Sequence, residues 1–381
     1  MPTRSDDGCD LGPTGHARSE EIRRQREDQG RRSLAVLPIH YPKEILTALD
    51  ILAVEMWGPP GAPRGDAAGR LQTYVCAVVR NAMAFLASGK ADAVDGVLFP
   101  HTCDSLQGLA TEASDFGAFG KKAFVFQHPR GVERASARRF LEAEMRSLAD
   151  ELEEWTGTKL TDGRLRRALE VHDEIDVYRA ALLDGRARLP LSDSQLYALL
   201  RRGEWLWPGE HLLELRAAVS RIESGPVQRG VPVLVTGYVP EPPGLLETLY
   251  GAGAFVAADD YAAIGRRIAR RDTARQANPW ADLVARYLSQ PPCPTRGTDQ
   301  EARMRHLVAL ADRSGARGVL VHVQKFCEPE LFDVPAIRRT FATRGLPVLV
   351  LEGELERELS GQTETRIEAF VELLSSQGRA A

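Results

Sequence analysis

The sequence predicts an α/β protein with two similar Rossmann-like parallel-sheet domains and a helical insertion between them. Three observations lead to this class. Unbroken apolar runs alternate with helical patterns in both halves of the chain, which is typical of parallel sheets covered on both faces. The order of elements in the first half is repeated in the second. The segment between the halves shows helical periodicity alone. The expected units are a first α/β domain at 34–133, a helical region at 134–225 and a second α/β domain at 226–381.

The composition is that of a globular protein. With 381 residues, 43% of them hydrophobic, the chain can give each domain its own core. Its 49 basic and 53 acidic residues leave a net charge of -4, so nothing indicates a general binder of nucleic acid or anionic membranes. No apolar run approaches the ~20 residues that span a bilayer, and the N-terminal stretch lacks the apolar segment of a secretory signal. We expect a cytoplasmic protein with no membrane partner.

Residues 1–33 are charged and poor in large apolar groups. Such a segment cannot bury enough surface to offset the entropy of ordering. We predict a disordered tail, and we expect Cys9 within it to take no part in a site.

The first α/β domain opens with strand, helix and strand over residues 34–58, where Pro38 and Pro42 interrupt the apolar pattern. A further buried strand is predicted around Val97 to Phe99, and another at 121–130.

In the helical region, large apolar residues recur at intervals of three and four, as on one face of a helix: Leu141, Met145, Leu148, Leu152 and Trp155. Gly157 is placed to end this helix, and Thr161 to cap the start of the next. This apolar stripe is most simply core.

The second α/β domain repeats the first. A strand, a proline-bearing loop, a helix and a strand are predicted over 230–260, followed by helix and strand at 305–329, a strand at 346–354 and a closing helix at 365–374. The repeated order indicates two similar domains.

Five cysteines are spread widely along the chain: Cys9, Cys76, Cys103, Cys293 and Cys327. Their odd number and wide spacing argue against a disulfide framework. A single cysteine is most often a small buried hydrophobe, so position must decide whether any of these has a chemical role.

Two cysteines occupy equivalent places in the two halves. Cys103 and Cys327 each follow the carboxyl end of a predicted buried strand. Ligands of open parallel sheets bind outside that edge. Two thiols at matching positions in facing domains can therefore meet in the cleft between them.

Cys76 lies in a stretch that reads as helical, upstream of Cys103, and Cys293 is its rough counterpart upstream of Cys327. The chain has no local C-x-x-C pair, unlike a zinc ribbon or a ferredoxin. Thiolates gathered singly from distant segments still suit an iron-sulfur cluster, with zinc as the second choice.

Motifs of other chemistries are missing from the sequence. It contains no G-x-x-x-x-G-K-[ST], H-E-x-x-H or G-x-S-x-G. The turn at Gly251 to Gly253 follows a helix, which favours a helix cap over a dinucleotide site. His101 and His322 lie beside the cysteine loops, where either a proton-transfer role or a structural role is open.

At this point the sequence resembles the 2-hydroxyacyl-CoA dehydratases and the related ATP-dependent benzoyl-CoA reductases, from about residue 36 to 375. The motifs that carry the resemblance are Thr102-Cys103-Asp104-Ser105, Lys325-Phe326-Cys327-Glu328-Pro329, Leu351-Glu352-Gly353-Glu354, the run from Gly361-Gln362 through Thr365-Arg366-Ile367-Glu368-Ala369-Phe370, and the segment from Glu153 to Leu160.

The resemblance implies a 4Fe-4S cluster bound by Cys76, Cys103 and Cys327 in the cleft. It implies pairing with a homologous second subunit, as a heterodimer or else a homodimer, and an ATP-dependent iron-sulfur activator that supplies one electron. In such dehydratases the electron converts an acyl-CoA thioester into a ketyl radical anion, so that the 2-hydroxyl leaves and an enoyl-CoA forms. In the reductases, similar electrons reduce an aromatic thioester.

The resemblance leaves the role of the subunit open. Three thiolates leave one iron with an open position that can act as a Lewis acid, whereas Cys293 as a fourth ligand would close the site and favour an electron relay. The residues next to the cysteine loops either tune the cluster or cap the loops: Asp104, Ser105, Lys325 and Glu328.

Overall fold

The computed structural model describes most of the chain. The described residues are 18–58, 71–89, 92–115, 120–131, 133–222, 230–270 and 275–377. The first 17 residues of the predicted tail, including Cys9, lie outside them.

The first domain is a parallel sheet of four strands in the order β2-β1-β3-β4. Its strands are β1 (Arg32–Val36), β2 (Ile51–Glu55), β3 (Gly96–His101) and β4 (Lys122–Gln127). The helices that belong to it are α2 (Lys43–Ala48), α3 (Ala77–Ala87) and α4 (Asp104–Asp115). The predicted strand, helix and strand at the start of this domain are therefore confirmed.

The second domain repeats this topology. Its parallel sheet has the order β6-β5-β7-β8, with strands β5 (Val231–Gly237), β6 (Ala254–Tyr261), β7 (Gly318–Gln324) and β8 (Val348–Gly353). Its helices are α9 (Gly244–Gly251), α11 (Gln300–Ser314), α12 (Glu328–Ala342) and α13 (Gly361–Gln377). Because the first strand of each domain pairs with the second and third, and the fourth extends the third, the predicted pair of similar α/β domains is confirmed.

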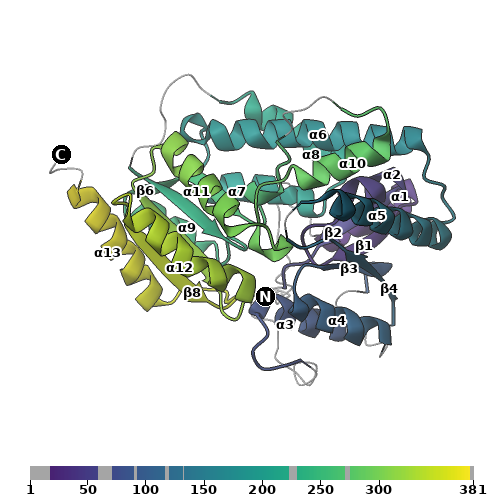
Figure 1. The fold of residues 1–381 in the computed structure, drawn as a ribbon, viewed down its shortest axis with the longest axis horizontal. Helices are drawn as coiled ribbons and strands as arrows, with labels where there is room; N and C mark the ends of the chain where they lie inside the picture. The colour runs from purple at the N-terminus through teal and green to yellow at the C-terminus, as the bar shows by residue number, and fades with distance from the viewer. Residues whose placement is uncertain are drawn as a thin grey trace, which may run out of the picture.

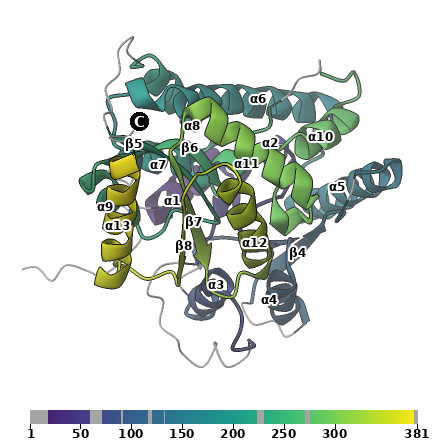
Figure 2. The same ribbon diagram turned by 60° about the vertical axis from the view of Figure 1, so that its left-hand side comes forward.

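The residues between the two sheets form helices, as expected. They are α5 (Ala135–Thr156), α6 (Asp162–Asp184), α7 (Asp193–Arg201) and α8 (Pro208–Val219), and α10 (Pro279–Leu288) packs with α5 and α6. Gly157 ends α5 in the left-handed conformation, with φ of 74°, and the Thr161 side chain caps α6 by accepting from the Arg164 amide. In both views α6 and α8 lie along the top of the two domains (Figures 1 and 2).

The prediction of a disordered tail up to residue 33 is wrong from Arg18 onward. Arg18–Gln29 form helix α1, and β1 begins at Arg32. Ile22 is only 6% exposed and belongs to the main core, and Arg18 binds Glu204 at 3.0 Å. These tertiary contacts order a segment whose local composition is too polar to order itself.

The two domains share one continuous core and several buried contacts. The largest apolar cluster includes residues of both sheets, and the rings of Trp57 and Tyr238 meet edge to face across it, 5.2 Å apart. Arg267 binds Glu55, and Arg286 binds Glu44 at 2.6 Å, so ion pairs also join the halves. Of the helices that the structure describes, none is both long and apolar enough to cross a membrane.

Candidate functional site

Three cysteines stand at the first turn of a helix. Cys76 is the N-cap of α3, Cys327 is the N-cap of α12, and Cys103 directly precedes α4. Cys103 and Cys327 follow the carboxyl ends of β3 and β7, as predicted. The N-terminus of a helix carries partial positive charge, which stabilises a thiolate placed there.

These three thiols are near enough to influence one another electrostatically. Burial, together with the nearby Cys76, raises the pKa of Cys103 to about 12. Burial raises the pKa of Cys327 well above its usual value, with Cys76 and Cys103 contributing. Cys76 and Cys327 belong to the same core cluster, and Cys103 packs against it. The fold therefore brings thiols of both domains within electrostatic reach of one another.

Backbone amides of the first helical turns oppose the effect of burial, because they lower the pKa of the thiols. The N–H groups of Val78 and Val79 lower the pKa of Cys76, which burial raises overall. Those of Ser105 and Leu106 do the same for Cys103. The sequence reasoning missed an aromatic side chain, Tyr238. Its pKa is raised by burial and then by four thiols, those of Cys103, Cys327, Cys76 and Cys293.

The same edge holds buried polar atoms that have no partner among the described residues. Each belongs to a residue at or just beyond the carboxyl end of a strand, and such atoms are normally satisfied in native proteins. They are His40 Nε2, Trp57 Nε1, His101 Nε2, Thr102 Oγ1, His128 Nε2 and both amide atoms of Gln324. Unsatisfied polar atoms at strand ends fit a site that a bound group would complete. Position at a strand end was the signal that could have identified His40, Trp57 and His128 from the sequence.

The two histidines singled out from the sequence differ in their surroundings. His101 is half-buried at the end of β3, with Nδ1 2.8 Å from Gln127 Oε1. His322 is buried within β7, with Nδ1 3.4 Å from the Tyr261 hydroxyl, and burial lowers its pKa to about 4. His322 is thus a neutral side chain inside the sheet, whereas His101 stands at its edge.

The polar residues of the cysteine loops are exposed to solvent or half-buried. Asp104, Lys325 and Glu328 are exposed, and Ser105 is half-buried. Arg130 lies 3.7 Å from the Asp104 carboxylate, and the Lys325 ammonium stands over the Phe326 ring at 5.2 Å. Exposed pairs of this kind contribute little to stability.

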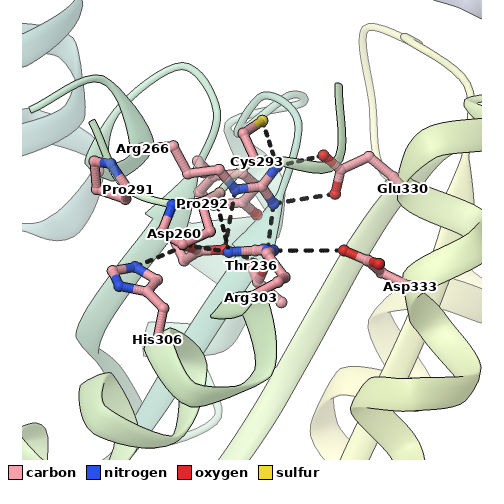
Figure 3. A network of polar contacts seen from close by, with 12 residues as sticks. Thr236, Asp260, Arg266, Pro291, Pro292, Cys293, Arg303, His306, Glu330 and Asp333 are labelled. Carbon is pink, nitrogen blue, oxygen red and sulfur yellow. Dashed lines mark hydrogen bonds and ion pairs between the residues drawn. The ribbon is translucent and has the colours of Figure 1, made fainter. Parts of the chain in front are cut away.

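Cys293 lies in a different environment, a buried ionic network shown in Figure 3. Its Sγ is 3.5 Å from Arg266 Nη1 and 3.0 Å from Thr295 Oγ1. Arg266 also binds Asp260 and Glu330, and Arg303 completes the network by binding Asp260. Cys293 therefore already has two polar partners of its own.

The described side chains do not form a ready site for a single metal ion. Within the part of the chain that the structure describes, no three His, Cys, Asp or Glu side chains converge closely enough to hold one metal ion. Such convergence is what zinc demands, because metal–sulfur bonds are only about 2.3 Å long.

Comparison with known proteins places these features in a family. Residues 38–374 match the family described as 2-hydroxyglutaryl-CoA dehydratase, D-component. The chain is 25% identical to the lactoyl-CoA dehydratase subunit beta of Anaerotignum propionicum, over 92% of this chain and 93% of the relative. It is 23% identical to the (R)-phenyllactyl-CoA dehydratase beta subunit of Clostridium sporogenes, over 93% and 94%.

A relative with a different named activity is equally similar. One subunit of the benzoyl-CoA reductase of Thauera aromatica is 26% identical over 84% of this chain and 85% of the relative. The resemblance to dehydratases and benzoyl-CoA reductases that the sequence predicted is therefore confirmed. The chain belongs to the family of the 2-hydroxyglutaryl-CoA dehydratase D-component.

Proposed function

We propose that this chain is the iron-sulfur subunit of a radical-type 2-hydroxyacyl-CoA dehydratase and holds a 4Fe-4S cluster on Cys76, Cys103 and Cys327. The observation that supports the proposal is the arrangement of these three thiols, two of them buried and one half-buried, each at the start of a helix and drawn from both domains. Membership of the family supports the acyl-CoA substrate class.

A bound cluster would supply one-electron transfer and an iron position with no protein thiolate, able to polarise an oxygen. The task of the protein is to bind it in the thiolate form. Because burial raises the pKa of all three thiols, loading releases protons and becomes more favourable as the pH rises. Three helix N-termini offset the negative charge that the site gains.

We propose that the polar atoms without partners orient the substrate. Burial lowers the pKa of His128 to about 4, so its ring is neutral. Its Nδ1 lies 3.2 Å from the Pro129 carbonyl, so this nitrogen carries the proton and Nε2 can accept a hydrogen bond from a hydroxyl. The Trp57 indole N–H can only donate, and it suits a carbonyl oxygen.

The hydrogen bonds that Cys293 makes to Arg266 and Thr295 favour a three-thiolate site over a closed, four-thiolate relay. A low-potential reductase of the benzoyl-CoA type is the second candidate, favoured by the similarity to the reductase of Thauera aromatica.

The partners follow from the same reasoning. Two of the relatives are named as beta subunits. We propose that this chain acts with a homologous second subunit, or as a homodimer, and receives electrons from an ATP-dependent iron-sulfur activator. The location proposed for this assembly is the cytoplasm.

The test is an anaerobic assay of the chain combined with a homologous subunit and an activator from the same genome. A panel of 2-hydroxyacyl-CoA esters and benzoyl-CoA is followed by mass spectrometry. Loss of water that requires ATP supports the dehydratase, and gain of two hydrogens by benzoyl-CoA supports the reductase. Cys103→Ser should abolish turnover, while Cys293→Ser should retain it. Equal turnover by wild type and Cys103→Ser would overturn the proposal.

A further inference from the structure

An ion pair joins the first domain to the second close to two of the thiols. Arg80 on α3 binds Glu354, which follows β8, and its Nη2 lies 2.5 Å from the Glu354 Oε2. The contact spans 274 positions of the sequence, and α3 lies below β8 in Figure 2. The two side chains are only 15% and 21% exposed, so salt weakens this pair less than a fully exposed one.

Arg80 is the only charged residue of α3. The rest of the helix is apolar apart from Asn81, and most of its residues are buried. No other side chain of α3 can therefore form an ion pair with the second domain. The single charge stands one turn after Cys76, which is the residue that begins the helix.

Within the first domain, Arg80 holds the backbone on both sides of Cys76. Its amide donates to the Cys76 carbonyl at 3.1 Å, in the first turn of α3. Its Nη1 donates to the carbonyl of Val75, the preceding residue, at 3.4 Å. The guanidinium that binds Glu354 is therefore also attached to the segment that positions the Cys76 thiol.

Within the second domain, Glu354 follows a residue that contacts the loop of Cys327. The Gly353 carbonyl accepts from the Lys325 amide at 2.7 Å. Phe326, between Lys325 and Cys327, has a φ of 63°, a left-handed conformation that is uncommon for a residue other than glycine. Such a backbone persists only when surrounding contacts hold it. The contact with Gly353 is one of these.

From these contacts we infer that the ion pair between Arg80 and Glu354 positions the Cys76 thiol relative to the Cys327 thiol. Both are positioning residues, because they act through the backbone of the two cysteine segments. The inference deepens the proposed function and rests on it in one respect, namely that the thiols of the two domains hold one bound group. The placement of the two segments can be measured without that group.

Hydrogen exchange of the full-length chain, followed by peptide mass spectrometry after a chelator has removed any iron, tests the inference. Each variant is examined in the domain whose sequence it leaves unchanged. Glu354→Gln should accelerate exchange in the first two turns of α3, and Arg80→Met should accelerate exchange at residues 324–328. We expect about 2- to 5-fold, the factor that corresponds to the loss of such an ion pair.

Two further variants distinguish this role from a general loss of stability. Arg216→Met is the matched control, because Arg216 forms an ion pair of the same 2.5 Å length with Glu174 inside the helical region, and it should leave both segments unchanged. The double variant with Arg80→Met and Glu354→Gln should exchange no faster than the faster single variant, since both remove one contact. Effects that multiply would contradict the inference. Glu354→Gln keeps the size of the side chain and decides the matter if Arg80→Met does not fold.

The iron-loaded chain gives a second measurement. A chelator should remove iron from Arg80→Met and Glu354→Gln about 2- to 5-fold faster than from the wild type, and from Arg216→Met at the wild-type rate. A wild-type chain without iron would refute the proposed cluster, while the exchange measurement would still decide the positioning role. Unchanged exchange at α3 in Glu354→Gln and at residues 324–328 in Arg80→Met would overturn the inference, whatever the iron content.

Discussion

Replacement of Arg266 by methionine tests the buried network of Figure 3. Arg266 and Asp260 are fully buried and Glu330 is 4% exposed. Arg266 donates to Asp260 Oδ2 at 3.1 Å, to Glu330 Oε2 at 3.0 Å and to Thr236 Oγ1 at 3.2 Å. Arg303 still neutralises Asp260 in the variant, but Glu330 is left buried without a counter-charge.

Breaking a buried ion pair in this way costs about 3–5 kcal/mol of unfolding free energy. With a urea m-value of about 3 kcal/mol/M, the unfolding midpoint should fall by about 1 to 2 M. Urea titration followed by tryptophan fluorescence measures the change. Arg305→Met is the control, since Arg305 forms only exposed pairs on α11, and it should change the free energy by less than about 0.5 kcal/mol.

The double variant with Arg266→Met and Glu330→Met should be more stable than Arg266→Met alone, because it removes the uncompensated carboxylate. The reasoning would be refuted if Arg266→Met lost less than about 1 kcal/mol of unfolding free energy, or if the double variant were less stable than Arg266→Met alone.

Three further predictions follow from single contacts. Burial opposes ionisation of Glu55, but Arg267 and Lys43 lower its pKa to about 2. The ionised carboxylate therefore stabilises the folded protein above about pH 4.5, and this stabilisation is lost as the pH falls toward 2. In acid unfolding experiments, the free energy of unfolding of Glu55→Gln should fall by about 3 kcal/mol less than that of the wild type over this range. Alkylation of Cys103 in cluster-free protein, followed by peptide mass spectrometry, should keep accelerating beyond pH 10, because the pKa of its thiol is about 12; a plateau near pH 8.5 would contradict this. Gly237→Ala should destabilise the protein by about 2 kcal/mol or more in urea titration, because its Cβ would lie 2.0 Å from the His322 carbonyl oxygen, while Gly361→Ala, with open space around it, serves as the control.

Periodicity was sufficient to predict the elements that carry the cysteines. The apolar runs that end near Cys103 and Cys327 are strands. Both faces of a parallel sheet are buried, so nearly every residue of such a strand is apolar and the run is unbroken in the sequence. The cap at Gly157 was readable for a similar reason, since a left-handed residue strongly favours glycine.

Features that depend on contacts between distant parts of the chain could not be predicted from sequence periodicity. Helix α1 has a polar sequence and is ordered by contacts with residues far along the chain, such as the pair of Arg18 with Glu204. Arg266 and Arg303 look like surface residues in the sequence, yet both are buried, because their partners come from other strands and helices. The hydrogen bond from Arg266 to Cys293 depends on that same network.

The meeting of Cys103 and Cys327 was an inference from the symmetry of the two halves, whereas Cys76 joined them only through the family resemblance. In the structure, Cys76 influences the pKa of both other thiols. Trp57 and Tyr238 were missed because an aromatic residue that follows a strand is as common in a hydrophobic core as in a functional site. Only their contact across the two domains distinguishes them.

Iron and sulfide analysis of the anaerobically purified chain tests the central claim most directly. Wild type and Cys293→Ser should each hold about four irons and four sulfides per chain, as one cubane requires. Cys76→Ser, Cys103→Ser and Cys327→Ser should each lose most of both. Colourless wild-type protein without iron, or an unchanged iron content in these three variants, would contradict the proposed cluster site.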